Sequence, residues 1–512
     1  MKSIYFILAL HAFCYPTIAQ FGVLDTTFNG NGKVTIDFLG HIDRGIAVAL
    51  QADKKIVVAG IVESGPLFGV TRIHSDGSLD LNFGVYGKVI TPIGTGGAFV
   101  SSVALQDDGK IIVAGSAFNG FVLVRYYPDG RIDSTFGDHG ILIKELSPFP
   151  NCASMAIQSD GKILLAGQMN NTNQDLVMVR YHANGIIDSS FGIFGMTITD
   201  IGLTHNGANA IALLPDGKIV AGGYVGGFPV GDFNLLRYHN DGRLDSTFSE
   251  DGYVRTSISQ FGDYVHGLTI QPDGKIVAVG RTNSGDPNHT DYDFVVMRYD
   301  VDGSLDNGFG TEGIMITIFG TEDEVATSVA VQPDGKIVAV GQTTFFQDSD
   351  FALARYQSDG TPDTTWGMNG MQTTDFHSGG DFAAGMVIQP DGKIVVVGSA
   401  LNGLHSDFAI ARYLSGLILG VIDFSFVGEV LIYPNPIREN VELEYTLEKD
   451  QILSIELYDL AGRLIQVFAS RISRTKGTHK ESLHLGEDII SGMYLINISN
   501  KTGGVSIKII KE

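Results

Sequence analysis

The stretch VQPDGKIVAVG, residues 331–341, returns almost unchanged as IQPDGKIVAVG at residues 270–280 and as IQPDGKIVVVG at residues 388–398. Pro333 suits the second position of a type I turn, Asp334 suits the third, and Gly335 takes a left-handed conformation at no steric cost. The apolar runs on both sides of the turn are typical of strands that are covered on both faces. The stretch therefore predicts a β-hairpin that the chain uses several times.

Three phrases recur seven times each along the chain. The middle residue of the turn stands at positions 54, 109, 161, 217, 274, 335 and 392, which gives spacings of 55, 52, 56, 57, 61 and 57 residues. An arginine, usually followed by tyrosine, comes after each turn, at Arg72, Arg125, Arg180, Arg237, Arg298, Arg355 and Arg412. A phrase of the form LDxTF begins at Leu24, Leu79, Ile132, Ile187, Leu244, Leu305 and Pro362. A fixed period of this size predicts a repeat architecture.

Each repeat predicts four short strands. The hairpin supplies two, the segment 350–360 supplies a third that ends in an Asp-Gly turn, and residues 371–376 supply a fourth. Seven such sheets, stacked around an axis, would bury both of their apolar faces. A β-helix has shorter rungs, and an open stack would need capping repeats at its ends. We therefore predict an all-β protein, a seven-bladed β-propeller of four-stranded antiparallel blades followed by a small C-terminal β-sandwich.

The ends of the repeat array favour a closed ring. The chain enters in mid-repeat at residues 24–38, and the last repeat leaves after residue 413 without an LDxTF phrase. We expect the N-terminal segment to pair with the final blade. The alternative is that residues 32–38 begin the first blade.

The first turn has Lys54 where the others have glycine. A left-handed lysine costs about 1 kcal/mol relative to glycine, so we expect that turn to be of another type.

The first 19 residues have the pattern of a secretory signal peptide. Lys2 precedes an apolar run at residues 4–13, and the small residue Ala19 marks a cleavage site before Gln20. Phe13 is too large for a lipoprotein signal at Cys14, and the apolar run is too short to span a bilayer. After cleavage one cysteine would remain, Cys152, so no intramolecular disulfide could form; we expect it to be a buried apolar residue.

The net charge of −23 argues against nucleic acid as a partner, because nucleic-acid binding requires a basic surface. Residues 427–512 contain ten Lys or Arg and twelve Asp or Glu, a net charge of −2, so residues 1–426 carry the remaining −21. The repeat region is therefore the acidic part. We read this charge as a solubility feature.

Two family resemblances follow from these residues. The phrases QPDGKIVVAG, FALARY and DGSLDxTFG resemble the delta-60 repeat family of bacterial surface and secreted proteins, which implies a propeller-like module without a known activity. The end of the chain resembles the C-terminal sorting domain of the type IX secretion system of Bacteroidetes-type bacteria. Its landmarks are YPNP at residues 433–436, DLAGR at 459–463, SGMYLI at 491–496 and SIKIIK at 506–511. The alternative for this end is an ordinary immunoglobulin-like module.

The sorting resemblance implies a β-sandwich, recognition by an outer-membrane translocon and removal after export. The residues that carry it are Tyr433, Pro434, Asn435, Pro436, Gly462, Gly492, Tyr494 and Lys508. Together with the composition, it divides the chain into a signal peptide (1–19), a propeller (20–416), a linker (417–430) and a sorting domain (431–512). We expect the type IX secretion machinery as a partner, no transmembrane segment, and a location outside the cell or on the outer-membrane surface.

The sequence contains no catalytic constellation. We expect the repeated Arg and the Asp of LDxTF either to hold their own blade together or to bridge to the next one; seven binding sites are the alternative. Five aspartates precede the third strands and are expected as turn caps, namely Asp175, Asp232, Asp293, Asp350 and Asp407. Acidic groups at 291–293, 348–350 and 321–324 offer oxygens of the kind that calcium binds, but without a recognised loop spacing. We therefore expect no cofactor and keep calcium as the alternative.

The predicted function is non-catalytic binding of glycans or proteins through loops on one propeller face. Phe228, Phe345 and Phe346 are candidate contacts. An extracellular hydrolase or lyase that uses the propeller channel is the second hypothesis, and it predicts clustered carboxylates there. A structural surface component is the third, and it predicts self-association without saturable binding.

Overall fold

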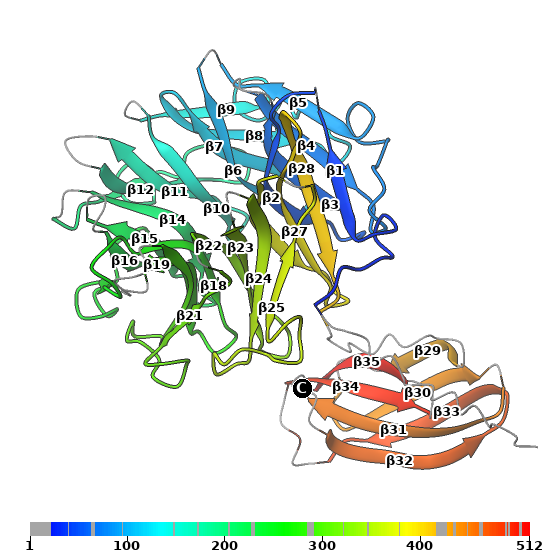
Figure 1. The fold of residues 1–512 in the computed structure, drawn as a ribbon. Helices are drawn as coiled ribbons and strands as arrows, with labels where there is room; N and C mark the ends of the chain where they lie inside the picture. Colours follow the sequence, from blue (N-terminus) through cyan, green and yellow to red (C-terminus); the bar gives the residue numbers. More distant parts are fainter. Residues whose placement is uncertain are drawn as a thin grey trace, which may run out of the picture.

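The computed structural model describes residues 22–38, 40–62, 67–94, 96–146, 149–170, 174–202, 205–226, 231–283, 291–320, 322–345, 348–377, 379–415, 427–433, 437–447, 449–459, 464–486, 489, 492–500 and 504–511. These residues form strands and turns, and no helix among them is long and apolar enough to cross a membrane. The strands build a ring of small sheets and, separately, two sheets near the C-terminus (Figure 1).

Seven four-stranded antiparallel sheets form the ring, as predicted. Six of them are continuous in the sequence: β2 (Arg44–Leu50), β3 (Ile56–Val62), β4 (Leu67–Ile73) and β5 (Lys88–Pro92); β6 (Ala98–Leu105), β7 (Ile111–Ala117), β8 (Gly120–Tyr126) and β9 (Ile141–Glu145); β10 (Asn151–Ile157), β11 (Ile163–Asn170), β12 (Gln174–Tyr181) and β13 (Met196–Thr199); β14 (Asn206–Leu213), β15 (Ile219–Val225), β16 (Asp232–Tyr238) and β17 (Tyr253–Thr256); β18 (Tyr264–Ile270), β19 (Ile276–Asn283), β20 (Tyr292–Tyr299) and β21 (Ile314–Thr317); β22 (Glu324–Val331), β23 (Ile337–Phe345), β24 (Asp348–Tyr356) and β25 (Met371–Thr374). We number these blades one to six in chain order.

Blade seven joins the two ends of the ring. It consists of β26 (Asp381–Ile388), β27 (Ile394–Asn402), β28 (His405–Tyr413) and, as its fourth strand, β1 (Lys33–Ile36) from the N-terminal segment. The register runs from Lys33 opposite Ala411 to Ile36 opposite Phe408, so that the blue β1 lies beside the yellow β28 (Figure 1). The predicted closure is confirmed, and the alternative that residues 32–38 begin the first blade is wrong.

The packing of the middle strands explains why their sequences are continuous apolar runs: both faces of each strand are buried. In β3, Val57 and Ala59 pack against blade two, whereas Ile56 and Val58 pack against blade seven, and all four are fully buried. A fully buried valine or isoleucine side chain contributes about 1.5–3 kcal/mol relative to exposure. Cys152 is buried in the same way in the core between blades two and three, which confirms its predicted place.

The repeated turn has the predicted geometry. The Gln332 N–H donates to the Lys336 carbonyl at 2.8 Å, the Gly335 N–H donates to the Gln332 carbonyl at 2.9 Å, and Gly335 has φ +84°. Lys54 adopts the same conformation with φ 67°, and its N–H donates to the Gln51 carbonyl at 2.9 Å. The expectation of a different turn type there is wrong, because the flanking strands keep the hairpin of the other six repeats.

The C-terminal region is a β-sandwich. One sheet has the order β29 (Val427–Tyr433), β30 (Asn440–Leu447), β33 (Gly477–His484), and the other has the order β32 (Leu464–Arg474), β31 (Gln451–Asp459), β34 (Gly492–Ser499), β35 (Gly504–Lys511). Alternate residues of β30 and β31, such as Leu443 and Ile455, are fully buried in one shared core. The strands β31 and β32 pair as the hairpin expected around DLAGR, whose residues 460–463 lie outside the described residues.

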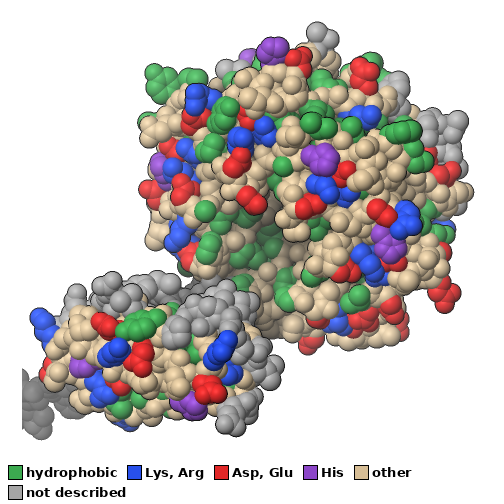
Figure 2. All heavy atoms as spheres, turned by 180° about the vertical axis from the view of Figure 1, so that it is seen from behind, with side chains coloured by type: hydrophobic (Ala, Val, Ile, Leu, Met, Phe, Trp, Pro, Cys, Tyr) green, Lys and Arg blue, Asp and Glu red, His purple; other side chains and the backbone are tan. Residues whose placement is uncertain are grey.

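Charged side chains are mixed on the surface. On the face in Figure 2, Lys and Arg side chains alternate with Asp and Glu over the propeller, and no large patch of one sign is visible there. This distribution accords with the solubility reading of the net charge.

Candidate functional site

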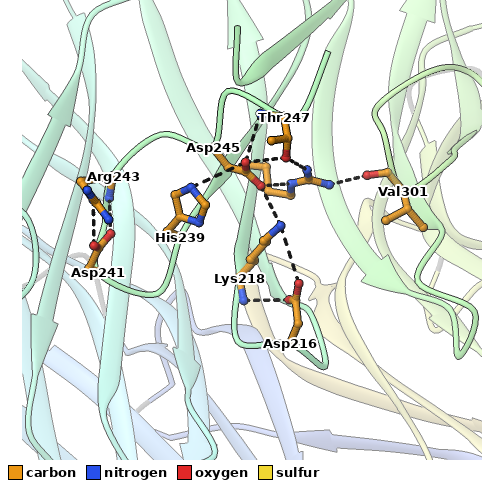
Figure 3. A network of polar contacts seen from close by, with 9 residues as sticks. Asp216, Lys218, His239, Asp241, Arg243, Asp245, Thr247 and Val301 are labelled. Atoms are coloured by element: carbon orange, nitrogen blue, oxygen red, sulfur yellow. Dashed lines mark hydrogen bonds and ion pairs between the residues drawn. The ribbon is translucent and has the colours of Figure 1, made fainter. Parts of the chain in front are cut away.

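Each blade contains an arginine that holds two blades together, which we call the clasp. In blade four, Arg237 Nε donates to Asp245 Oδ2 at 2.7 Å, while its Nη1 donates to the Val301 carbonyl of blade five (Figure 3). The Thr247 hydroxyl and the Lys218 ammonium also bind Asp245, at 2.6 and 3.0 Å. Asp245 is fully buried, so this network neutralises a carboxylate that has lost all contact with water.

The clasp recurs in all seven blades. In chain order, each arginine binds a carboxylate of its own blade and a carbonyl of the next: Arg72 binds Asp80 and Pro128, Arg125 binds Asp133 and Ala183, Arg180 binds Asp188 and Asn240, Arg237 binds Asp245 and Val301, Arg298 binds Asp306 and Ser358, Arg355 binds Asp363 and Ser415, and Arg412 binds Asp25 and Ser75. The prediction of a structural role is confirmed: each Arg–Asp pair lies within its own blade, and the same arginine bridges to the next blade through a main-chain carbonyl.

An aromatic ring completes each clasp. The Arg237 guanidinium lies 4.7 Å from the centre of the Phe248 ring, and Trp366 takes the same position under Arg355. Burial alone would raise the pKa of the partner carboxylates. Hydrogen bonds from Ser190 and the charge of Arg180 outweigh it at Asp188 and lower the pKa of that carboxyl to about 2. The clasp is therefore a charged structural device. Blade six departs from the pattern, because Arg355 reaches Asp363 through Nη2 at 2.8 Å and its Nε has no hydrogen-bond partner among the described residues.

The first strand of every blade lines a central channel. Each of these strands has a β-bulge at the same place, which turns one residue toward the axis: Ile46, Ser101, Ala153, Asn209, His266, Thr327 and Ala384. Bulges re-aim side chains and are frequent beside binding sites. The seven blades share their frame, but these seven residues differ in size and polarity.

Two cavities lie along the channel between the described first strands. One of about 520 Å³ lies where the first strands begin, and Arg44, Gln342 and Phe382 form its rim together with the bulge residues of six blades. The second, of about 300 Å³, continues along the channel and is lined by small, polar and aliphatic residues. The described residues that line the two cavities include no Asp or Glu.

His266 is a titratable residue of the channel lining. Its Nε2 is buried and has no hydrogen-bond partner among the described residues. Burial, together with the positive charge of Arg281, lowers the pKa of His266 to about 4. The imidazole is therefore neutral at pH 7, and the residue lines both cavities.

The five aspartates expected as turn caps lie in strands instead. Asp350 pairs with Thr343 across the β23–β24 hairpin and Asp407 pairs with Ala400 across β27–β28, and Asp175, Asp232 and Asp293 occupy matching positions in β12, β16 and β20. The correction has a simple reason. The second and third strands extend beyond the apolar run, so that these residues continue the ladder before the loop starts.

A second acidic position escaped the sequence reading, except for Glu324, which lies in the acidic phrase 321–324. Asp43, Asp263, Glu324 and Asp381 are fully buried at or just before the start of a first strand. Each accepts a main-chain N–H from the loop that leads to it; the Phe376 N–H, for example, donates to Asp381 Oδ2 at 2.6 Å. All four precede the middle residue of the turn by eleven residues, at positions 54, 274, 335 and 392. That constant spacing is the signal that could have revealed them.

The two acidic positions meet between blades. Asp350, Asp375 and Asp381 form one group and Asp37, Asp43 and Asp407 another, and in each group one oxygen per carboxylate lies within 4.8 Å of the others. Of the acidic phrases at 291–293, 348–350 and 321–324, only Asp350 enters these groups. Burial raises the pKa of Asp381 and of Glu324 to about 7.

The described sorting residues do not form one site. Tyr433 ends β29 with 41% of its surface exposed and lies under the Lys480 ammonium, whereas Tyr494 of β34 is buried in the sandwich core beside Gly492. Lys508 pairs with Leu495 in the β34–β35 ladder. Ala19, Gln20, Pro434, Asn435, Pro436, Gly462, Phe228 and Phe346 lie outside the described residues, as does the side chain of Phe345.

Comparison with known families identifies both regions. The family described as domain of unknown function (DUF5122) β-propeller matches residues 51–83, 106–136, 158–191, 214–248, 271–309, 332–365 and 389–416. These segments fall on the seven repeats assigned above. The family described as secretion system C-terminal sorting domain matches residues 431–512. No curated protein matches the chain.

Several solved structures are similar in fold. PorZ, a surface component of the type IX secretion system of Porphyromonas gingivalis, is 13% identical with a TM-score of 0.44, and the alignment covers 94% of this chain and 60% of PorZ. Virginiamycin B lyase from Staphylococcus aureus is 11% identical with a TM-score of 0.44, over 74% of this chain and 98% of the lyase. A PL25 ulvan lyase is 10% identical with a TM-score of 0.43, over 74% and 96%.

The sorting domain implies that the protein interacts with the secretion machinery. It also implies delivery out of the cell or to the outer-membrane surface. The chain is thus an exported protein that joins a seven-bladed DUF5122 β-propeller to a secretion system C-terminal sorting domain.

Proposed function

We propose that the propeller is a non-catalytic glycan-binding protein and that the channel mouth, the cavity of about 520 Å³ rimmed by Arg44, Gln342 and Phe382, is its binding site. The observation that carries this proposal is the set of differing side chains at equivalent positions of seven otherwise similar blades. A repeated frame that presents different residues at one place resembles a scaffold with a grafted site.

The chemistry of the mouth suits a sugar chain. Phe382 has 44% of its surface exposed and offers a flat apolar face, and the planar polar groups of Asn209 and Gln342 line the same cavity from other blades. The Asn209 amide donates to the Val265 carbonyl at 2.7 Å, which fixes its orientation across blades four and five. Sites that combine an apolar wall with a few oriented polar groups are typical of small-molecule and oligomer recognition.

The enzyme hypothesis finds less support at this mouth. A hydrolase or lyase of the kind considered above would place clustered carboxylates in the channel, whereas the acidic groups described here lie between blades. The neutral His266 remains the residue on which a lyase would depend. The structural-component hypothesis needs no pocket and would leave the mouth without a role.

A binding screen distinguishes the three functions. The chain from Gln20 onward is tested against a panel of polysaccharides, and the length of each polymer is measured after incubation. Saturable binding that Phe382→Ala weakens at least tenfold, without polymer shortening, supports the proposal. Phe194→Ala is the matched control, because Phe194 is 84% exposed on another loop. Polymer shortening that His266→Ala abolishes would favour a lyase, and self-association without saturable binding would favour a structural role.

A further inference from the structure

The two acidic groups flank the blade that closes the ring. Asp350 comes from β24 of blade six, Asp375 follows β25, and Asp381 opens β26 of blade seven. In the second group, Asp407 comes from β28 of blade seven, Asp37 follows the N-terminal strand β1, and Asp43 precedes β2 of blade one. Each group therefore joins two blades through three carboxylates of like charge.

Asp381 carries a buried oxygen that lacks a hydrogen-bond partner. Its Oδ2 accepts the Phe376 N–H, but its Oδ1 has no partner among the described residues, and the residue is fully buried. The neighbouring Leu401 N–H donates to the Gly380 carbonyl at 3.2 Å. A buried acceptor without a partner destabilises the folded protein, and more so when it is charged. The carboxylates of Asp350 and Asp375, which share the group, cannot donate to it while they are ionised.

Blade four shows how the protein satisfies this position with its own cation. There the third-strand aspartate, Asp232, is bonded by Arg255 of the fourth strand. Arg255 pairs with Asn234, two residues after Asp232. The fourth-strand residues that correspond to Arg255 are Thr373 in blade six and Thr35 in blade seven. In both blades a threonine therefore stands where blade four has arginine, and the acidic group contains a third carboxylate, Asp375 or Asp37.

Lys33 lies next to the blade-six group, and its ammonium contacts a main-chain carbonyl and an aromatic ring there. Its ammonium donates to the main-chain carbonyl of Asp375 at 2.8 Å and lies over the Phe376 ring. The carboxylates of the group therefore still face one another.

We propose that each group, Asp350–Asp375–Asp381 and Asp37–Asp43–Asp407, binds a calcium ion. Calcium takes oxygen ligands at about 2.3–2.6 Å, so two ligands on opposite sides of one ion lie about 5 Å apart. The carboxylate oxygens of each group fall within 4.8 Å of one another, which matches that span. The groups contain no His or Cys, so zinc and the softer metals are disfavoured.

Calcium at these places would reinforce ring closure. One ion would join blade six to blade seven, and the other would join the N-terminal segment, blade seven and blade one. The inference stands apart from the proposed glycan binding, because neither group contributes a residue to the channel mouth.

The test is a calcium titration of the chain from Gln20 onward after treatment with a chelator. We expect two equivalents to bind with a Kd of about 10⁻⁴–10⁻³ M, the range of extracellular calcium modules, and magnesium to bind at least tenfold more weakly. The melting temperature of the propeller should rise with calcium concentration, because the folded state binds the ion. Asp375→Asn should remove one equivalent and Asp37→Asn the other; both residues are exposed, so both variants should fold.

Asp232→Asn is the matched control in blade four and should bind calcium as the parent does. Binding of no calcium, or of two equivalents by both Asp375→Asn and Asp37→Asn, would overturn the proposal. Loss of calcium in Asp232→Asn would also contradict it, because the ion would then respond to acidic charge in general. All of these readouts are independent of any glycan.

Discussion

Lys54 adopts a left-handed backbone (φ 67°) at a position where the other six turns have glycine. Its side chain is exposed, so the strain is not offset by packing. We predict that Lys54→Gly raises the free energy of unfolding by up to about 1 kcal/mol, because glycine relieves the strain but loses more entropy on folding. Urea denaturation measures the change. Gly109→Ala, at φ 79° in the next repeat, should lower stability by a similar amount. A Lys54→Gly variant less stable than the parent would contradict this reading.

Asp381 gives the propeller a pH dependence of known sign. Burial raises its pKa in the folded protein to about 7, above the ordinary value of 3.8. The folded state therefore holds this proton more tightly, and the stability that the group contributes below pH 4 is lost as the pH rises through 7. In chelator, we expect Asp381→Asn to be more stable than the parent by about 1–3 kcal/mol at pH 8 and to lose that advantage at pH 4. Denaturant titrations at the two pH values test this. An equal difference at both would contradict it.

At the scale of the element, blade four contains both a clasp and an exposed Arg–Asp ion pair. Arg237 binds the fully buried Asp245 at 2.7 Å, and Arg243 binds Asp241 at 2.8 Å with 79% of its side chain exposed (Figure 3). The two distances are alike but the environments differ. Removal of one partner from a buried pair leaves an uncompensated charge and costs about 3–5 kcal/mol, whereas an exposed pair contributes about 0–1 kcal/mol.

We therefore predict that Arg237→Met lowers the free energy of unfolding by about 3 kcal/mol and that Arg243→Met lowers it by less than 1 kcal/mol. Both variants make the same replacement of an arginine by an unbranched apolar side chain, so the comparison isolates the difference between the buried and the exposed environment. Equilibrium unfolding of the two variants and the parent gives both values. Equal losses would show that burial of Asp245 does not control the clasp.

The elements also show what sequence reasoning could and could not reach. The turn, the four strands and the Arg–Asp pairs were predictable because each repeats at a fixed place within one blade. The acidic groups were not, because Asp350 and Asp381 belong to different blades and meet only through their packing. The channel residues escaped for a related reason. A bulge turns His266 toward the axis, and nothing in the VHGL sequence announces a bulge.

At the scale of the whole molecule, the ring depends on its first residues. The segment 22–38 supplies β1, the Asp25 partner of Arg412, and three buried aromatic or aliphatic side chains, Phe28, Ile36 and Phe38. Each such side chain contributes about 1.5–3 kcal/mol on burial. The sorting sandwich has a separate core, formed by residues of β29 to β35 and the segments between them. The propeller should therefore depend on its N-terminal segment and not on its C-terminal domain.

Two truncations test this dependence. A chain that starts at residue 40 should lose at least about 5 kcal/mol of propeller stability, because an open blade seven exposes the edge of β28 and the core between blades seven and one. A chain that ends at residue 430 should unfold within about 1 kcal/mol of the parent propeller, because the two regions have separate cores. Calorimetry resolves the propeller transition in each. An N-terminal truncation that melts like the parent would mean that β1 does not close the ring, and a C-terminal truncation that fails to fold would mean that the sandwich belongs to the propeller's folding unit.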